Sequence, residues 1–523
     1  MLTSLERWRG PETMQQDRPG EPEAGGPEAA SVGTPDPVVL RPMFPEAVAD
    51  DPSPTRPSPF RSTTEFLLVL IVGILVVRAF AAEAYIVPTG SMAPTLLGMH
   101  RDILCPNCDK RFSLGMDIQG RIGRAVCPNC GQTELENAPT SDSLGDRLLV
   151  QKFLYDLRPP RRWEVAVFQN PAELSEAYVK RVVGLPGESV LLWGGDVYIN
   201  GRLARKTLAE ARAMSIPVYD HKYTPKDIAR YPRWVLRHGD ARKPMQTGWR
   251  AEGSRFLLRP VDEGASTPDW VEYRHWQADR GNFGPIRDYT SYNGADVPGE
   301  NRVHDLMLTA RVAAGPGCEA MLVRVDSGGD RFIVNLPVGP AKPISVRRNG
   351  RALPLTLNAS VPALQADLAK PHVLEVAIVD RRLSVTIDGN LAFTPVDYDD
   401  VAQRPNWTSS PVAIGTLGTG SAEIQDVRID RDVYYTDALS QTPRRPFGVE
   451  VPYNLGVNEY FVLGDNSPVS NDSRFWIGSP VVAGERFLGK PFLVHLPSQA
   501  VPLQVFGRDL YWIPDPREIR YIR

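Results

Sequence analysis

The chain has 523 residues, of which 42% are hydrophobic, 23% are charged and 49 are proline. This length favours two or three folded units over one core, and the apolar content excludes a wholly disordered chain. A net charge of −3 gives no electrostatic reason to expect nucleic-acid binding, and five cysteines exclude a disulfide-dense scaffold.

The N-terminal part divides into a polar tail and an apolar run. Residues 1–61 are rich in Pro, Gly, Glu and Ala and cannot bury enough apolar surface to offset the entropy lost on ordering, so we expect a disordered tail there. The 17 residues from Phe66 to Ala82, apolar except for Arg78, would rise about 25 Å as a helix, enough for a hydrocarbon core if Arg78 reaches the interface. We therefore expect a membrane helix over 62–84. A buried core helix and a cleaved signal peptide are the alternatives.

Two sets of short apolar runs, closed by Gly or Pro, predict strands after this helix. The first lies between 146 and 202. The second begins near Leu306 and includes 373–387, which ends at the turn pair Asp388-Gly389.

The second set resembles a concanavalin-like or laminin-G-like jelly roll. We expect this β-sandwich within an insertion over 205–441, most clearly over 300–435. Residues 205–301 show little periodicity, and we assign them no structure. The ligand of the insertion stays open between a glycan and a protein, and a plain spacer fits equally, because a fold does not determine a function.

Three polar features are ordinary when each is taken alone. Ser91, between Gly90 and Met92, is typical of a turn. Lys180 lies in an apolar strand, where a lysine most often has a solvated head. The loop over 464–474 follows another apolar strand. Their order along the chain is the informative property.

Four motifs together resemble type I signal peptidase, a membrane-anchored serine endopeptidase that removes signal peptides from exported proteins. They are Gly-Ser-Met-x-Pro-Thr-Leu at 90–96, Gly-Asp-Arg-x-x-Val-x-Lys at 145–152, Lys-Arg-Val-Val-Gly-Leu-Pro-Gly at 180–187, and Gly-Asp-Asn with Asp-Ser-Arg within 464–474. The resemblance implies a mainly β chain in which a signal-peptidase-type catalytic domain follows one membrane helix. This domain is discontinuous, over 85–204 and 442–500, and 501–523 is a C-terminal extension. The sequence departs from the family at Ser467-Pro-Val, after Gly-Asp-Asn.

The resemblance also implies a catalytic dyad. Ser91 would attack the scissile carbonyl, and Lys180 would act as general base and then as general acid, with no histidine and no cofactor in catalysis. A lysine with an ordinary pKa of about 10.4 can act as a base only when desolvation lowers its pKa, and the neighbouring valines supply an apolar setting. The Thr89 hydroxyl and the Ser91 backbone N–H would form the oxyanion hole. The further implied positions are dyad support at Ser470, Asp472, Arg474, Gly464, Asp465 and Asn466, and substrate binding at Ile86, Pro88 and Met92.

Three of these residues have structural alternatives. A plain structural salt bridge accounts for Asp472 and Arg474 equally well, and core packing is the favoured role of Ile86. The implied substrate pockets are shallow and apolar, and they admit small side chains at the first and third positions before the cut.

The resemblance implies preproteins with signal peptides and the lipid bilayer as partners. It places the chain in the cytoplasmic membrane with a single pass and the catalytic domain on the outer side, which charge alone does not decide. Two alternatives differ in function. One is a membrane-anchored glycan- or protein-binding module on a degenerate peptidase scaffold, and the other is a self-cleaving regulator.

Four of the five cysteines form two C-x2-C pairs, Cys105 with Cys108 and Cys127 with Cys130, eighteen residues apart. This spacing presents four thiolates to a tetrahedral Zn²⁺, and the insert over 101–140 resembles a zinc ribbon. We expect a structural zinc here, with two disulfides or free thiols as the alternatives.

Overall fold

The computed structural model describes residues 59–76, 82–117, 119–135, 138–171, 173–227, 232–239, 247–259, 266–339, 342–358, 370–399, 407–436, 446–498, 500–505 and 508–522. The predicted tail lies outside these residues except at its end, as do residues 77–81 of the predicted membrane helix. Helix α1 spans Pro59–Val76 and contains the boundary between two compact units, at Leu67 and Leu68. Within the described ranges, no helix is long and apolar enough to cross a membrane.

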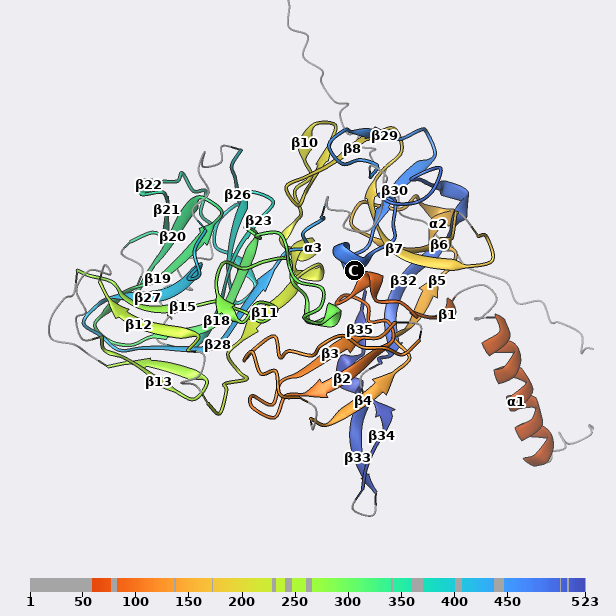
Figure 1. The fold of residues 1–523 in the computed structure, drawn as a ribbon, viewed down its shortest axis with the longest axis horizontal. Helices are drawn as coiled ribbons and strands as arrows, with labels where there is room; N and C mark the ends of the chain where they lie inside the picture. Colours follow the sequence, from red (N-terminus) through yellow and green to blue (C-terminus); the bar gives the residue numbers. More distant parts are fainter. Residues whose placement is uncertain are drawn as a thin grey trace, which may run out of the picture. The chain divides into compact units, whose positions relative to one another are not determined.

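The strands between residues 82 and 184 form one antiparallel sheet with strands between residues 459 and 496 (Figure 1). Residues near 180 and 460 therefore become neighbours although the chain between them is long. In spatial order the described strands are β1 (Ala82–Ile86), β5 (Arg147–Gln151), β32 (Phe487–Leu496), β6 (Val165–Gln169), β7 (Ala177–Gly184), β30 (Glu459–Leu463) and β31 (Val482–Ala483).

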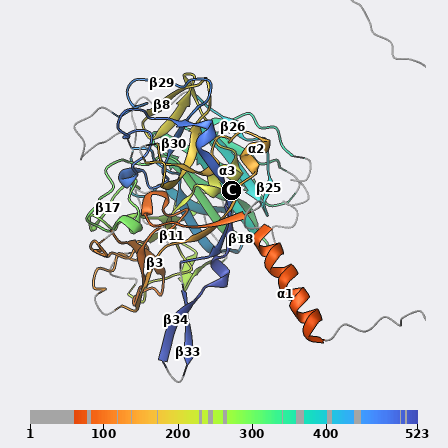
Figure 2. The same cartoon turned by 90° about the vertical axis from the view of Figure 1, so that its right-hand side faces the viewer.

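A smaller sheet lies next to this one in sequence, and the C-terminal residues return to the larger sheet. The smaller sheet contains β10 (Arg202–Leu203), β9 (Asp196–Ile199), β8 (Ser189–Trp193) and β29 (Tyr453–Asn454). The predicted C-terminal extension forms a projecting hairpin, visible in both views (Figure 2), and then β35, which pairs with β32. These strands are β33 (Ala500–Val505), β34 (Arg508–Pro514) and β35 (Arg520–Tyr521).

The large insertion forms two sheets that pack face to face. The first contains β13 (Trp249–Glu252), β14 (Arg255–Leu258), β28 (Ala422–Arg431), β18 (Leu306–Ala314), β23 (His372–Val379), β24 (Arg382–Ile387), β25 (Asn390–Leu391), β11 (Ile216–Asp220) and β26 (Val396–Asp397). The second contains β12 (Trp234–His238), β15 (Asp269–Tyr273), β27 (Val412–Gly418), β19 (Cys318–Ser327), β20 (Asp330–Pro337), β21 (Ser345–Arg348) and β22 (Arg351–Ala352).

The core of this sandwich follows from the alternation of its strands. One apolar cluster joins the two sheets. It contains the fully buried side chains of Val376 and Ile424 from the first sheet and of Val323 and Ile414 from the second. The turn pair Asp388-Gly389 joins β24 to β25 with two positive φ angles, 49° and 81°, which suits a tight hairpin.

The stretch to which the sequence assigns no structure, 205–301, supplies strands to both sheets. Strands β11, β13 and β14 join the first sheet and β12 and β15 join the second. Helix α3 (Leu208–Ala213), the hairpin β16 (Trp276–Gln277) and β17 (Asn282–Phe283), and the 3-10 turn η3 (Ser291–Asn293) complete it. The mainly β prediction is confirmed, and the sandwich begins well before residue 300.

The cysteine-bearing insert is built on a three-stranded sheet with the order β3 (Arg111–Gly115), β2 (His100–Leu104) and β4 (Thr140–Ser143). Helix α2 (Leu154–Leu157) follows it after β5. Each C-x2-C pair lies in a turn of the same shape, because Asp109 N donates to Cys105 O and Gly131 N donates to Cys127 O, both at 2.9 Å.

Candidate active site and metal-binding residues

Ser91 and Lys180 lie within hydrogen-bond distance of each other. Ser91 is half-buried in the 3-10 turn η2 (Gly90–Met92), directly after β1, and Lys180 lies in β7. The Lys180 Nζ atom donates to Ser91 Oγ at 2.6 Å. The fold thus joins two residues that are 89 positions apart in the sequence.

Burial changes the acidity of the lysine. Lys180 is only 4% exposed, and desolvation lowers its pKa from 10.5 to about 8. The carboxylates of Asp472 and Asp465 oppose this effect, and the Arg474 guanidinium adds to it. At mildly alkaline pH a large share of this amine is therefore neutral and can accept a proton.

Asp472 and Arg474 form an ion pair beside the lysine. Both side chains are fully buried, and Arg474 Nη2 and Nε donate to the carboxylate at 2.7 and 2.9 Å. Asp472 Oδ2 also accepts from the Gly464 N–H at 3.0 Å. The pair therefore stabilises the loop and acts electrostatically on the Lys180 amine, while its role in supporting a dyad stays a prediction.

Ser467, where the sequence departs from the family, takes part in this buried network. Its hydroxyl accepts from Arg474 Nη1 and from the Thr436 N–H, both at 2.8 Å. The replacement thus gives the guanidinium a further acceptor and ties the loop to the end of the large insertion.

Ser470 and Thr89 make no hydrogen bond to Ser91 or Lys180 within the described part of the chain. Ser470 is buried, and its Oγ makes no hydrogen bond within the described part of the chain. Thr89 is exposed at the start of η2, and its side chain does not cap the turn. The roles of Ser470 and Thr89 stay predictions.

The sequence analysis missed Arg181 as a site residue. Arg181 is buried and donates to Asp465 through Nε at 2.8 Å and Nη2 at 2.5 Å. Asp465 Oδ2 also accepts from Thr95 Oγ1 at 2.5 Å. The sequence could have indicated this residue, because Arg181 directly follows Lys180 in an apolar strand and a buried arginine needs a carboxylate partner.

A cleft of about 880 Å³ opens at the dyad. Strand β1 is an edge strand, and residues 177–180 of β7 pair with β6 but with no other described strand. Both segments line the cleft, so an extended peptide can pair with their free edges.

The predicted substrate positions differ in their placement. Ile86 is 54% exposed and lines the cleft with Pro88, so its expected core packing is wrong. Met92 has no exposed surface and packs in the core with Leu96 and Val150. It is not among the cleft residues, which corrects its predicted place in a substrate pocket, because η2 turns its side chain into the core.

The four paired cysteines converge. Their Sγ atoms all lie within 4.8 Å of one another, and the distances are 3.5 Å from Cys105 to Cys130 and 3.6 Å from Cys108 to Cys127. A disulfide needs about 2.05 Å, whereas Zn–S bonds of about 2.3 Å in a tetrahedron place two sulfurs about 3.8 Å apart. The geometry therefore fits a tetrahedral metal ion.

A buried cation beside the cysteines provides a second test of this fit. Arg233 is 4% exposed, its Nη2 donates to Asn129 O at 2.8 Å, and its Nε and Nη1 have no partner within the described ranges. It interacts electrostatically with Cys127 and Cys130. Four thiolates around Zn²⁺ carry a net charge of −2, so a buried guanidinium at this position is favourable.

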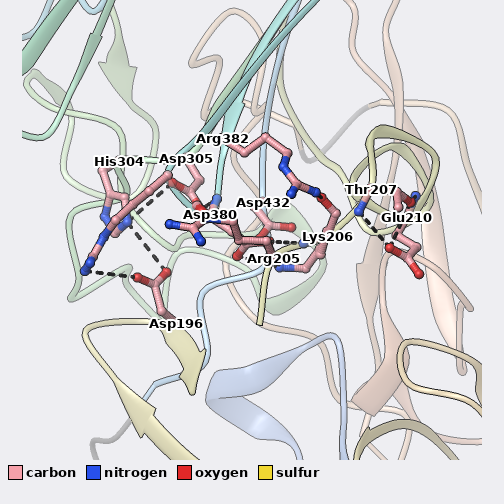
Figure 3. Close-up of polar contacts among 11 residues, drawn as sticks. Asp196, Arg205, Lys206, Thr207, Glu210, His304, Asp305, Asp380, Arg382 and Asp432 are labelled. Carbon is pink, nitrogen blue, oxygen red and sulfur yellow. Dashed lines mark hydrogen bonds and ion pairs between the residues drawn. The ribbon is translucent and has the colours of Figure 1, made fainter. Parts of the chain in front are cut away.

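A second group of buried acids has a lysine as its cation. Asp305, Asp380 and Asp432 each bring a carboxylate oxygen within 4.8 Å of the others, but Lys206 Nζ pairs with Asp380 at 3.0 Å and with Asp432 at 2.8 Å (Figure 3). The Lys206 ammonium also lies 4.7 Å from the centre of the Trp163 ring. Two of the three carboxylates in this group therefore already have an ammonium partner.

The network joins the sandwich to the smaller sheet. His304 approaches Asp305 at 3.3 Å and Asp196 of β9 at 3.6 Å. Burial alone would lower the pKa of His304, but these two carboxylates outweigh it and raise the pKa to about 9. His304 thus links the insertion to the smaller sheet.

Comparison with known proteins identifies relatives. The family model for signal peptidase, peptidase S26, matches residues 130–239. A signal peptidase I of Leptolyngbya laminosa is 30% identical over 195 residues, which cover 36% of this chain and 70% of that protein. A signal peptidase I of Pseudomonas aeruginosa is 28% identical over 207 residues, which cover 36% of this chain and 53% of that protein.

The similarity to solved structures is weak. The carbohydrate binding module CBM66 of Bacillus subtilis covers 38% of this chain and 95% of its own, with 11% identity and a TM-score of 0.24. The exoplasmic/lumenal domain of VIP36 covers 42% and 88%, with 12% identity and a TM-score of 0.23.

Both sequence relatives carry the name signal peptidase I. The match to the Leptolyngbya laminosa protein extends over more than two thirds of that relative at 30% identity. The chain therefore belongs to the signal peptidase I family of serine endopeptidases.

Proposed function

We propose that this chain cleaves signal peptides from exported preproteins with Ser91 as nucleophile and Lys180 as general base. The observation that carries the proposal is the 2.6 Å contact between the Lys180 amine and the Ser91 hydroxyl, together with the lowered pKa of the amine. A serine hydroxyl is a weak nucleophile until a base within hydrogen-bond distance takes its proton.

The proposed reaction needs only groups of this chain and water. The neutral Lys180 amine accepts the Ser91 proton while Oγ bonds to the scissile carbonyl carbon. The oxyanion is stabilised by the Ser91 N–H and the Thr89 hydroxyl. The Lys180 ammonium then donates its proton to the leaving amine, the C–N bond breaks, and an acyl-enzyme remains. Water, deprotonated by Lys180, hydrolyses the ester and restores Ser91.

The cleft suits the substrate class. An extended signal peptide would pair with the free edges of β1 and β7, and Ile86 would contact the residues before the cut. An apolar and partly exposed contact of this kind favours small side chains there. Asp472 and Arg474 would maintain the position of the Gly464 loop beside the lysine, and Ser470 would hold the Lys180 amine.

The test is cleavage of a purified preprotein by the intact chain in detergent, with sequencing of the N-terminus of the product. We expect a cut after a small-x-small site, and Ser91→Ala to remove it. An intact chain that binds a glycan or protein but cuts nothing would support the binding-module alternative. Cutting of its own chain only would support the self-cleaving regulator.

We also propose that Cys105, Cys108, Cys127 and Cys130 hold a structural Zn²⁺. All four ligands would be protein thiolates, which leaves no open position for substrate or water. The ion would supply folding free energy to the cysteine-bearing insert and would take no part in peptide hydrolysis.

We further propose that the apolar part of α1 anchors the chain in the cytoplasmic membrane with the catalytic domain on the outer side. Its residues from Phe66 to Val72 are apolar and between 45% and 69% exposed, which a lipid environment would make favourable. After alkaline carbonate washing of membranes, we expect the chain to stay in the pellet. Release into the supernatant would contradict the anchor.

A further inference from the structure

The turn η3 of the large insertion contacts the turn that carries Ser91. Tyr292 is 6% exposed, and a Cβ atom added at Gly90 would lie only 2.0 Å from its ring. A Cβ atom at Gly115 of the cysteine-bearing insert would lie 2.4 Å from the same ring. The Tyr292 hydroxyl donates to Met99 O at 2.8 Å. The ring thus fills a space that only glycine at both positions leaves open.

The next residue, Asn293, continues this contact through hydrogen bonds. Its side-chain amide exchanges two bonds with the Asn466 amide, at 2.8 and 2.7 Å. Asn466 Nδ2 also donates to Gly90 O at 2.8 Å, and the Asn466 N–H donates to Ser91 O at 3.0 Å. Asn293 therefore orients the side-chain amide of Asn466, which bonds Gly90 O, while the backbone N–H of the same residue bonds Ser91 O.

The η3 segment is itself held from two directions. Arg431 of β28 donates to Asp288 O at 2.8 Å and to Tyr289 O at 3.0 Å, which ties the segment to the sandwich. On its other side, the Ala295 N–H donates to Arg124 O at 2.9 Å, which ties it to the cysteine-bearing insert. Both inserts thus fix the position of η3.

The same segment lines the cleft at the dyad. Tyr292, Asn293, Asp296 and Val297 line it, as do Met116 and Asp117 of the cysteine-bearing insert. One wall of the cleft therefore comes from the two inserts.

We propose that η3 is part of the active site and that Tyr292 and Asn293 are positioning residues for Ser91. They act through Gly90 and Asn466, so the large insertion sets the turnover rate of the peptidase instead of serving as a spacer. The inference rests on the proposed function. Its physical basis is that a displacement of about 1 Å at a reacting atom can reduce a rate about 10²-fold.

The test compares Asn293→Ala with Asn390→Ala in the full chain. Asn390 is an exposed amide of the same insertion, donates to Asp388 O at 3.4 Å and does not line the cleft. We expect Asn293→Ala to lower kcat about tenfold with KM within about twofold. The midpoint of the pH–rate profile should stay unchanged, because the Lys180 surroundings are intact. Asn390→Ala should keep wild-type kcat.

Two tyrosine variants separate the ring from the hydroxyl. Tyr292→Ala should lower kcat by about 10²-fold, whereas Tyr292→Phe, which keeps the ring against Gly90, should lower it at most about threefold. Wild-type kcat in folded Asn293→Ala and Tyr292→Ala would overturn the proposal.

Hydrogen exchange of backbone amides tests the positioning role without the preprotein assay. Amides 90–92 should exchange faster in Asn293→Ala than in the wild type, and at the wild-type rate in Asn390→Ala. If the wild type cleaves no preprotein, the proposed function fails while this exchange difference still supports the positioning role. Equal exchange in all three proteins would overturn it.

Discussion

Replacing Lys180 with methionine is expected to lower kcat on the order of 10⁴-fold, the upper end of what a general acid–base group contributes, because one amine serves both acylation and deacylation. Methionine has a similar length and no charge, so it suits a side chain that is 4% exposed. The melting temperature should stay equal or rise, since burial of an ammonium is unfavourable. Initial rates on a preprotein, with thermal unfolding of both proteins, measure this.

The same role of Lys180 predicts how kcat/KM depends on pH. A lysine with a pKa of 10.5 would be roughly 0.3% neutral at pH 8, whereas one with a pKa of about 8 is half neutral. In the wild type, kcat/KM should therefore rise about tenfold per unit below pH 7 and level off above pH 9. The exposed Lys222 offers a matched control, and Lys222→Met should keep the wild-type profile. Lys180→Met within tenfold of wild-type activity would contradict the dyad.

Replacing Cys105 with serine is expected to remove bound zinc and to lower the free energy of unfolding of the cysteine-bearing insert by at least about 3 kcal/mol. The physical reason is that a tetrahedral site contributes its binding free energy to folding only when all four thiolates are present. Elemental analysis of the purified wild type should find about one zinc per chain. Thermal unfolding with and without a zinc chelator should show a lower transition temperature when the metal is removed.

Cys318 offers the matched control for this experiment. It is buried in the sandwich core, far along the chain from the paired cysteines, and its Sγ lies 3.6 Å from Ala320 O. Cys318→Ala should keep the full zinc content. A metal-free chain with two disulfides, seen by mass spectrometry of a non-reduced digest, would contradict the zinc site.

Short sequence patterns predicted several features of the fold and the site. The four motifs of the catalytic part are sufficient to indicate the family, and the alternating run around 373–387 with Asp388-Gly389 predicted a hairpin that the protein contains. The two C-x2-C pairs predicted the convergence of four cysteines. In each case the necessary information lies within a few neighbouring residues, because turn geometry, strand alternation and ligand spacing are local properties.

Other features depended on contacts between distant residues. Arg181 and Asp465 are 284 positions apart, and Asn293 and Asn466 are 173 apart, so no local pattern pairs them. Ile86 is exposed in the cleft, contrary to its expected core packing, because β1 lies at a sheet edge. Met92 is buried in the core, contrary to its expected place in a substrate pocket, because the turn η2 directs its side chain inward.

The sequence by itself determined the family, the mainly β class and the residues that could react. Only the tertiary structure decided that the aperiodic stretch before residue 301 completes the sandwich and places η3 against the turn that carries Ser91. The physical reason is that Tyr292 and Gly90 are held together by packing and by hydrogen bonds whose partners come from three separate parts of the chain. Such an arrangement exists only once the two inserts and the catalytic sheet have folded against one another.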